Sequence, residues 1–81
     1  MYTIVTRDQC NFCDSAKILL KGAGQGYTEY NVQSPSSKWV LTLLKQAGRK
    51  TVPQIFSSDG SYIGGYAELK ALFGKVEGSL E

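Results

Sequence analysis

The sequence predicts one small α/β domain, a four-stranded mixed sheet flanked by three helices in the order β-α-β-α-β-β-α. Three observations support this fold class. The chain has 81 residues, of which 42% are apolar, enough for one modest core without disulfide support. Strand-like and helix-like stretches alternate in the first half, which indicates parallel strands joined by a right-handed crossover. A hairpin pattern in the second half adds an antiparallel pair of strands.

The first half of the chain supplies two strands and the first helix. Residues 2–6 are all β-branched or aromatic and predict a short buried strand. From about Asn11, apolar side chains recur at helical spacing until a glycine-rich stretch, so we expect an amphipathic helix there. Residues 27–32 alternate between two faces, as a strand does. Ser34 and Pro35 then predict the N-cap and the first turn of a second helix.

The second helix is expected to pack through one apolar face. This face consists of Val40, Leu43, Leu44 and Ala47. Gly48 suits the left-handed position that follows the last turn. Trp39 lies off the centre of the face, and we interpret it as a half-buried packing residue. The helix should therefore cover one side of the sheet.

The last part of the chain predicts a hairpin and a third helix. Residues 54–57 and 61–63 have strand character and flank a turn at Asp59-Gly60. The third helix is expected to begin at about Tyr66 and to end before Gly74. This order completes the mixed sheet and places helices on both of its faces.

Composition narrows the class of protein. No linker or repeat divides the chain, so we assign residues 1–74 to one domain and residues 75–81 to a polar tail that frays. The net charge is +2 without a basic block, which argues against nucleic-acid binding. No apolar run is long enough to span a membrane, and the first residues lack the pattern of a secretory leader. We therefore expect a cytoplasmic monomer.

The two cysteines of the chain stand three residues apart in Cys10-Asn11-Phe12-Cys13. A disulfide between them closes a very short loop and stabilises little, so a purely structural role is disfavoured. The chain has no His, so a zinc site within one monomer would need carboxylate ligands, and we expect no metal. A C-x-x-C pair beside a β-α unit is instead typical of a redox site.

The positions of the two thiols predict their roles. Cys10 stands at the start of the predicted helix, where unpaired N–H groups, the helix dipole and nearby Arg7 favour the thiolate. Because the thiolate is the form that attacks disulfides, Cys10 is predicted to be the nucleophile without a histidine base. Cys13 lies one turn inside the helix and should be more buried and less acidic. It would resolve the mixed disulfide formed at Cys10.

Three motifs give the chain its resemblance to a known family. They are Cys10-Asn11-Phe12-Cys13, Thr51-Val52-Pro53 and Gly64-Gly65-Tyr66-Ala67-Glu68. In this order and spacing the chain resembles the glutaredoxins, the glutathione-linked branch of the thioredoxin-like fold, up to about Phe73. The resemblance implies a glutathione-dependent oxidoreductase that reduces protein disulfides and glutathione mixed disulfides. Its implied partners are glutathione, as reductant, and disulfide-bearing proteins, with ribonucleotide reductase a candidate by analogy.

The resemblance also implies a glutathione site. Arg7 and Arg49 match basic positions of the family, Arg7 the one that faces the glycine carboxylate, with Lys50 as the alternative to Arg49. A surface charge is the other interpretation of each. The Val52–Pro53 bond would be cis, so that the Val52 backbone pairs with glutathione like an added strand. The remaining residues carried over are Phe12, Thr51, Gly64, Gly65, Tyr66, Ala67 and Glu68.

The third motif is expected to bind the γ-glutamyl end. Gly64-Gly65 would allow positive φ, and backbone N–H groups of Tyr66 and Ala67 would hold the carboxylate. Glu68 would take the α-amino group. The chain departs from the family in three ways: Asn11 replaces the proline of many dithiol members, Ala67 lacks a polar side chain, and Glu68 is a methylene longer than the usual Asp.

Two other functions stay open on the sequence. Some relatives without the active-site proline hold a [2Fe–2S] cluster in a homodimer, and Cys10 with bound glutathione could do the same. A small redoxin recharged by thioredoxin reductase is the other alternative. Arg7, Arg49 and Gly64-Gly65 disfavour it, because they suit a charged tripeptide.

Overall fold

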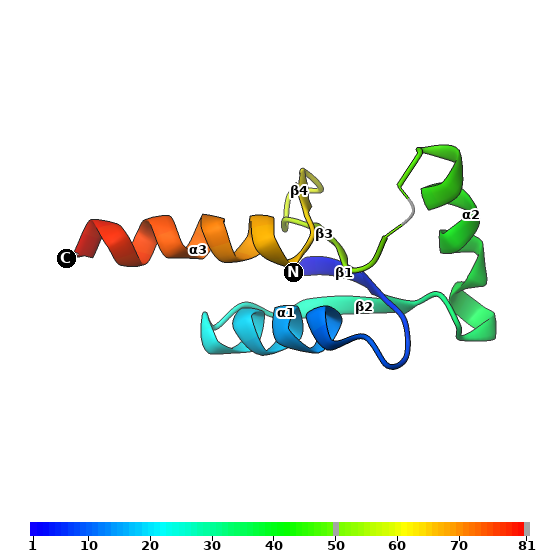
Figure 1. The fold of residues 1–81 in the computed structure, drawn as a ribbon, viewed down its shortest axis with the longest axis horizontal. Helices are drawn as coiled ribbons and strands as arrows, with labels where there is room; N and C mark the ends of the chain where they lie inside the picture. Colours follow the sequence, from blue (N-terminus) through cyan, green and yellow to red (C-terminus); the bar gives the residue numbers. More distant parts are fainter. Residues whose placement is uncertain (50, 81) are drawn as a thin grey trace.

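The computed structural model describes residues 1–49 and 51–80 and contains one mixed sheet of four strands (Figure 1). The strands, in sheet order β2-β1-β3-β4, are β2 (Tyr27–Asn31), β1 (Tyr2–Thr6), β3 (Gln54–Phe56) and β4 (Tyr62–Gly64). β1 is parallel to β2 and antiparallel to β3, and β3 is antiparallel to β4. The predicted mixed sheet with its terminal hairpin is confirmed.

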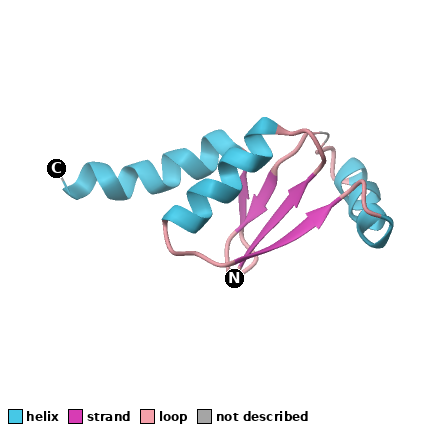
Figure 2. Cartoon of the chain, turned by 90° about the horizontal axis from the view of Figure 1, so that it is seen from below, coloured by secondary structure: helices cyan, strands magenta, loops and turns pink. Residues whose placement is uncertain are grey.

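Three α-helices flank the sheet. α1 (Asn11–Gly22) and α3 (Tyr66–Leu80) pack against each other on one face, and α2 (Lys38–Gln46) lies on the other side (Figure 2). The predicted order of elements is therefore confirmed. None of the helices in the described ranges is long and apolar enough to cross a membrane.

Each face of the sheet has its own apolar cluster. Between the sheet and the pair α1 and α3, the cluster consists of Ile4, Ala16, Leu20, Ile55 and Leu69, all without solvent exposure. Beneath α2, the cluster consists of Val5, Val32, Val40 and Leu44. The apolar face predicted for the second helix is thus only half buried, because Leu43 and Ala47 are exposed. Gly48 has φ of +76°, as expected for the residue after the last turn.

The second helix begins differently from the prediction. Pro35–Ser37 form a 3₁₀ turn, η1, closed by the Ser37 N–H donating to the Ser34 carbonyl at 3.0 Å, and α2 starts only at Lys38. Ser34 precedes the turn, but its side chain makes no capping hydrogen bond. Serine is a weak helix former, because its hydroxyl competes for nearby backbone groups, which favours a short turn here.

The third helix ends later than predicted. α3 continues past Gly74 to Leu80, so the predicted end before Gly74 is wrong. A glycine inside a helix costs only about 1 kcal/mol relative to alanine, and no proline follows to stop the helix. The division into a domain of residues 1–74 and a fraying tail stays a prediction.

The turn between β3 and β4 is held by an acidic side chain. Asp59 accepts hydrogen bonds from the Ser57 hydroxyl and from the Ser61 N–H, the latter at 2.9 Å. These bonds, first that from Ser57 and then that from Ser61, lower the pKa of Asp59 to about 2. Gly60 supplies the positive φ, +89°, that the turn requires.

Candidate active site

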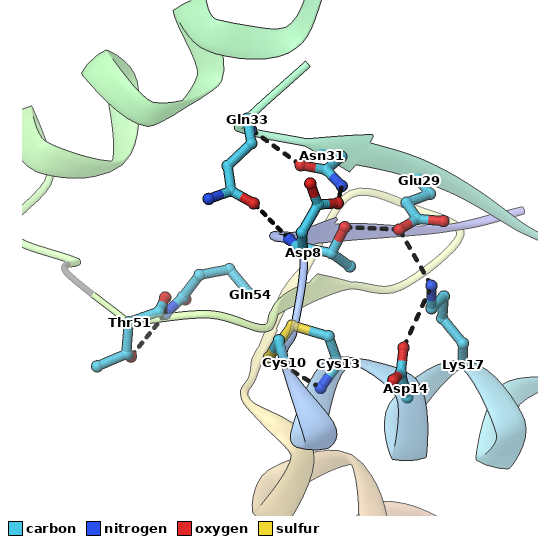
Figure 3. The surroundings of a disulfide bond; sticks show 11 residues. Asp8, Cys10, Cys13, Asp14, Lys17, Glu29, Asn31, Gln33, Thr51 and Gln54 are labelled. Carbon is cyan, nitrogen blue, oxygen red and sulfur yellow. Dashed lines mark hydrogen bonds and ion pairs between the residues drawn. A yellow bond between two sulfur atoms is a disulfide. The ribbon is translucent and has the colours of Figure 1, made fainter.

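The two cysteines lie at the N-terminus of α1, where β1 leads into the helix (Figure 3). Cys10 is the N-cap residue, with extended φ and ψ of −121° and 102°, and Cys13 lies in the first turn. The two form a disulfide, with their Cα atoms 5.2 Å apart. The predicted positions of both thiols are confirmed.

The helix end acts on the Cys10 sulfur directly. Its Sγ accepts a hydrogen bond from the Cys13 N–H at 3.2 Å, as the side chain of an N-cap residue does. Once the disulfide is reduced, the same N–H and the helix dipole favour the thiolate at Cys10. Cys10 is 7% exposed and Cys13 is 1% exposed, so the predicted order of burial is confirmed.

The loop that leads to Cys10 is tied to the end of β2. The Asp8 N–H donates to Gln33 Oε1 at 2.6 Å, and Asn31 Nδ2 donates to Asp8 Oδ1 at 2.8 Å (Figure 3). Gln9 adopts a left-handed φ of +53°, which is uncommon for a residue with a side chain. The two polar contacts of Asp8 could not be predicted from the sequence, because the partners are 23 and 25 residues away.

A pocket of about 220 Å³ lies at the start of α1, where Phe12, between the two cysteines in sequence, forms part of its lining. It is formed by three separate segments of the chain, the start of α1, the segment before β3 and the start of α3. Its lining residues are Phe12, Thr51, Val52, Pro53, Gly65, Tyr66, Ala67 and Glu68. All eight belong to the predicted glutathione site. The fold therefore brings together three motifs that are distant in sequence.

The wall formed by Thr51 to Pro53 is supported from behind. The Val52–Pro53 bond is cis, as the family resemblance implies. Gln54, only 4% exposed, donates from Nε2 to the Thr51 carbonyl at 2.7 Å, and its Oε1 accepts from the Tyr62 hydroxyl at 2.6 Å. Gln54 and Tyr62 thus hold the segment from Thr51 to Pro53 in position, a role that the sequence analysis did not predict. A glutamine at a buried strand position was the available signal.

Within the described residues, neither the N–H nor the C=O of Val52 takes part in a hydrogen bond. Both groups belong to a pocket-lining residue, so a ligand with an extended backbone could pair with them. Phe12 and Tyr66 close the pocket on another side, with ring centroids 5.9 Å apart and planes inclined by 29°. Phe12 is 64% exposed and forms the rim.

The turn before α3 has the positive φ expected of the Gly64-Gly65 pair. The positive φ, +129°, falls on Gly64, whereas Gly65 has an ordinary backbone conformation. Glu68 Oε1 accepts a hydrogen bond from the Gly65 N–H at 2.7 Å. This is the return bond of a capping box, so Glu68 stabilises the start of α3 and has only its second oxygen for a ligand. The spacing of Gly65 and Glu68 could have revealed it.

Three residues of the predicted glutathione site do not line the pocket: Arg7, Arg49 and Gly64. Arg7 is exposed in the loop before Cys10. Arg49 has its guanidinium 3.9 Å from the centre of the Tyr62 ring, facing another cavity. Lys50, the alternative to Arg49, lies outside the described residues. Their roles in binding stay predictions.

Charged side chains near α1 form one small network. Lys17 Nζ lies 3.2 Å from Glu29 and 3.7 Å from Asp14, and Glu29 accepts a hydrogen bond from the Thr6 hydroxyl at 2.6 Å (Figure 3). Partial burial acts to lower the pKa of Lys17, but the hydrogen bond and charge of Glu29, with Asp14, outweigh it and raise the pKa. Among residues with a described placement, no group of three or more His, Cys, Asp or Glu could hold a metal.

Comparisons with known proteins agree with this geometry. The family model described as Glutaredoxin matches residues 2–63. Glutaredoxin 3 of Escherichia coli strain K12 is 39% identical over 69 residues, covering 85% of this chain and 81% of that protein. Glutaredoxin 1 from Francisella tularensis, complexed with cacodylate, has a TM-score of 0.74 at 30% identity, covering 95% of both chains. A buckwheat glutaredoxin–glutathione complex has a TM-score of 0.74 at 27% identity, covering 91% of this chain and 70% of its own.

Proposed function

Because the chain belongs to the glutaredoxin family and carries its cysteine pair, we propose that it reduces protein disulfides and glutathione mixed disulfides with glutathione as the reductant. Thiol–disulfide oxidoreduction follows from the family. The observation that supports glutathione as co-substrate is the pocket at the cysteine motif, whose eight lining residues, Phe12 among them, all come from the three glutaredoxin motifs.

Reduction of a glutathione mixed disulfide needs only Cys10. Its thiolate attacks the glutathione sulfur, the substrate's S–S bond breaks, and the substrate thiolate leaves and takes up a proton from water. Cys10 is then joined to glutathione. A second glutathione, as thiolate, attacks that glutathione sulfur and releases oxidised glutathione and the Cys10 thiolate. The pocket would hold the glutathione moiety in both steps.

Reduction of a protein disulfide uses both cysteines. The Cys10 thiolate attacks one substrate sulfur and forms a mixed disulfide with the substrate. The Cys13 thiolate then attacks the Cys10 sulfur, which releases the second substrate thiol and leaves the Cys10–Cys13 disulfide, the form present in the structure. Two glutathione molecules reduce it and leave as oxidised glutathione. The short Cα–Cα separation of 5.2 Å lets Cys13 reach Cys10 within the first helical turn.

The features of the pocket support binding of the tripeptide along its length. The Val52 backbone offers one donor and one acceptor for the cysteinyl residue, and the first N–H groups of α3 offer donors for a carboxylate. A buckwheat structural relative is a glutathione complex. We further propose that the protein acts as a cytoplasmic monomer on disulfide-bearing proteins, with ribonucleotide reductase as one candidate.

Two single replacements test this function. In an assay that couples turnover of a glutathionylated peptide to glutathione reductase and NADPH, Cys10→Ser should abolish activity, because no other thiolate lies at the helix terminus. Cys13→Ser should retain it, since the resolving thiol is not needed for this substrate. Both variants should lose reduction of a protein disulfide. If Cys13→Ser is as inactive as Cys10→Ser on the glutathionylated peptide while both remain folded, the assigned roles are wrong.

A further inference from the structure

A second cavity lies between α2 and the sheet, and none of its lining residues lines the pocket at the cysteine motif. Its volume is about 420 Å³, within the range of roughly 300–1,000 Å³ that is typical of binding sites. We call it the α2 groove. Val5, Tyr30 and Phe56 form its floor on the sheet, Trp39 and Leu43 its wall on α2, and Arg49 lies just beyond the end of that helix.

The wall of the α2 groove is unusually exposed for an apolar surface. Trp39 is 56% exposed and Leu43 is 53% exposed, although both lie on the side of α2 that turns toward the sheet. Trp39 is nevertheless held in place, because its ring packs edge-on against Tyr30 at 6.1 Å and its Nε1 donates to the Ser36 carbonyl at 3.0 Å. Large apolar side chains fixed around an open concavity are typical of a binding surface.

The charge of this region is one-sided. Residues 30–58 contain four of the nine Lys and Arg and none of the seven Asp and Glu, so this stretch carries +4 and the rest of the chain −2. Among the residues that the structure describes, Arg49 is the single charged one that lines the α2 groove, and none of the lining residues is a carboxylate. Both ion pairs of the described residues involve Lys17, so Arg49 has no acidic partner among them.

We infer that the α2 groove binds an acidic amphipathic segment of a protein partner. Apolar side chains of the segment would enter between Trp39, Leu43 and the sheet, and its carboxylates would face Arg49 and the exposed lysines of α2, Lys38 and Lys45.

The shape and the charge of the groove favour this occupant over two others. A flat lipid surface does not enter a groove bounded by a helix and a sheet, whereas side chains spaced at i, i+3, i+4 and i+7 along a helix do. A second copy of this chain would bring a stretch of +4 against another of +4, and like charges oppose that contact.

Trp39 gives a direct measurement, because it is the only tryptophan of the chain. The probe is a blocked peptide without tryptophan that has Leu at i, i+3, i+4 and i+7 and Glu at its other positions. Titrated into the oxidised protein without glutathione, it should shift Trp39 emission to shorter wavelength as the ring is covered. The same peptide with Lys in place of Glu should not bind. Because glutathione is absent, the result is independent of the proposed catalytic function.

Three variants locate the contact. Leu43→Asp places a charge in the groove and should weaken the acidic peptide about tenfold or more. Arg49→Gln should weaken it about two- to fivefold, as expected for a partly exposed ion pair. Thr42→Asp is the matched control, because it adds the same charge to α2 at an exposed residue that does not line the groove, and it should change affinity less than twofold. All three variants should keep a cooperative thermal unfolding transition, which shows that they remain folded.

Four results would overturn the inference. They are an unchanged Trp39 spectrum with the acidic peptide, equal binding of the lysine peptide, equal losses in Leu43→Asp and Thr42→Asp, and a dimer in sedimentation velocity that Leu43→Asp dissociates. The last result would assign the groove to a second copy of the chain. A fifth result, a shift of Trp39 emission with anionic phospholipid vesicles in place of the peptide, would also overturn it, because it would assign the groove to a lipid surface.

Discussion

The two faces of the sheet are packed differently. Under α1 and α3, five apolar side chains are fully excluded from solvent: Ile4, Ala16, Leu20, Ile55 and Leu69. Under α2, the four core residues are 2% to 7% exposed, and a groove of about 420 Å³ opens beside them. The cysteine pair belongs to α1, so the redox site rests on the closed face.

Polar contacts reinforce this difference. Lys17 of α1 lies 3.2 Å from Glu29 of β2, and Glu29 accepts a hydrogen bond from Thr6 of β1. No ion pair joins α2 to the sheet in the part of the chain that the structure describes. A thiol pair that must meet within one helical turn benefits from a fixed helix, whereas a docking surface must stay open. We therefore expect replacements under α1 to act mainly on stability and replacements along α2 to act mainly on binding.

Equivalent Leu→Ala replacements on the two faces of the sheet should give the largest difference in the free energy of unfolding. Leu20→Ala leaves a cavity in the sealed core and should lower the free energy of unfolding by about 4 kcal/mol, near the upper part of the range for Leu→Ala. Leu44 borders the α2 groove, which water already reaches, so Leu44→Ala should lower the free energy of unfolding by about 2 kcal/mol. Urea unfolding measures both. Equal costs at unchanged m-values would show that the two faces are packed alike.

The two glycines before α3 allow a smaller and more local test. A Cβ on Gly64 would lie 2.7 Å from Glu68 Cγ at a φ of +129°, so Gly64→Ala should lower the free energy of unfolding by about 1–3 kcal/mol. A Cβ on Gly65 would lie 3.4 Å from the Pro53 carbonyl oxygen, an ordinary contact, so Gly65→Ala should cost less than about 1 kcal/mol.

The same pair separates folding from binding. Gly65 lines the pocket, so the larger side chain of Gly65→Val should raise the KM for glutathione while the protein remains folded. Steady-state kinetics with a glutathionylated peptide measures this effect. A wild-type KM in folded Gly65→Val would mean that the third motif serves only as a strand-to-helix turn.

Local patterns predicted most of the fold, and the family resemblance predicted most of the pocket. The strands, the hairpin and the N-cap position of Cys10 follow from short patterns and their order. The eight pocket-lining residues follow from the resemblance to the glutaredoxins. The start of α2 was missed because a 3₁₀ turn and an α-helix differ only in which carbonyl accepts each N–H bond. The end of α3 was missed because a glycine weakens a helix without terminating it.

Contacts between distant residues could not be read from the sequence. Gln54 supports Thr51 through a side chain that also meets Tyr62 on the next strand, and Asp8 meets Asn31 across the end of the sheet. No local pattern encodes such pairs. Arg49 is a further example of a placement that the sequence did not predict. Its position in the sequence suits the glutathione site, but its side chain lines the α2 groove.

Removing the ion pair between Lys17 of α1 and Glu29 of β2 should have the smallest effect on the free energy of unfolding. Lys17 and Glu29 are both partly exposed, so Lys17→Met should lower the free energy of unfolding by only about 0.2–1 kcal/mol at neutral pH. The folded pKa of Lys17 is raised above its ordinary value of 10.5, against the opposing effect of its burial, mainly by Glu29. Its stabilisation is therefore fully present below pH 10.5 and is lost as the pH rises through the folded pKa.

The difference between wild type and Lys17→Met should accordingly shrink in strongly alkaline solution. Lys70→Met is the matched control, because Lys70 is exposed on α3 and forms none of the ion pairs of the described residues. Urea unfolding of the three proteins, repeated from neutral pH upward, measures both differences. A Lys17→Met deficit that matches that of Lys70→Met at neutral pH, or that persists unchanged above the folded pKa, would show that α1 is held to the sheet by apolar packing alone.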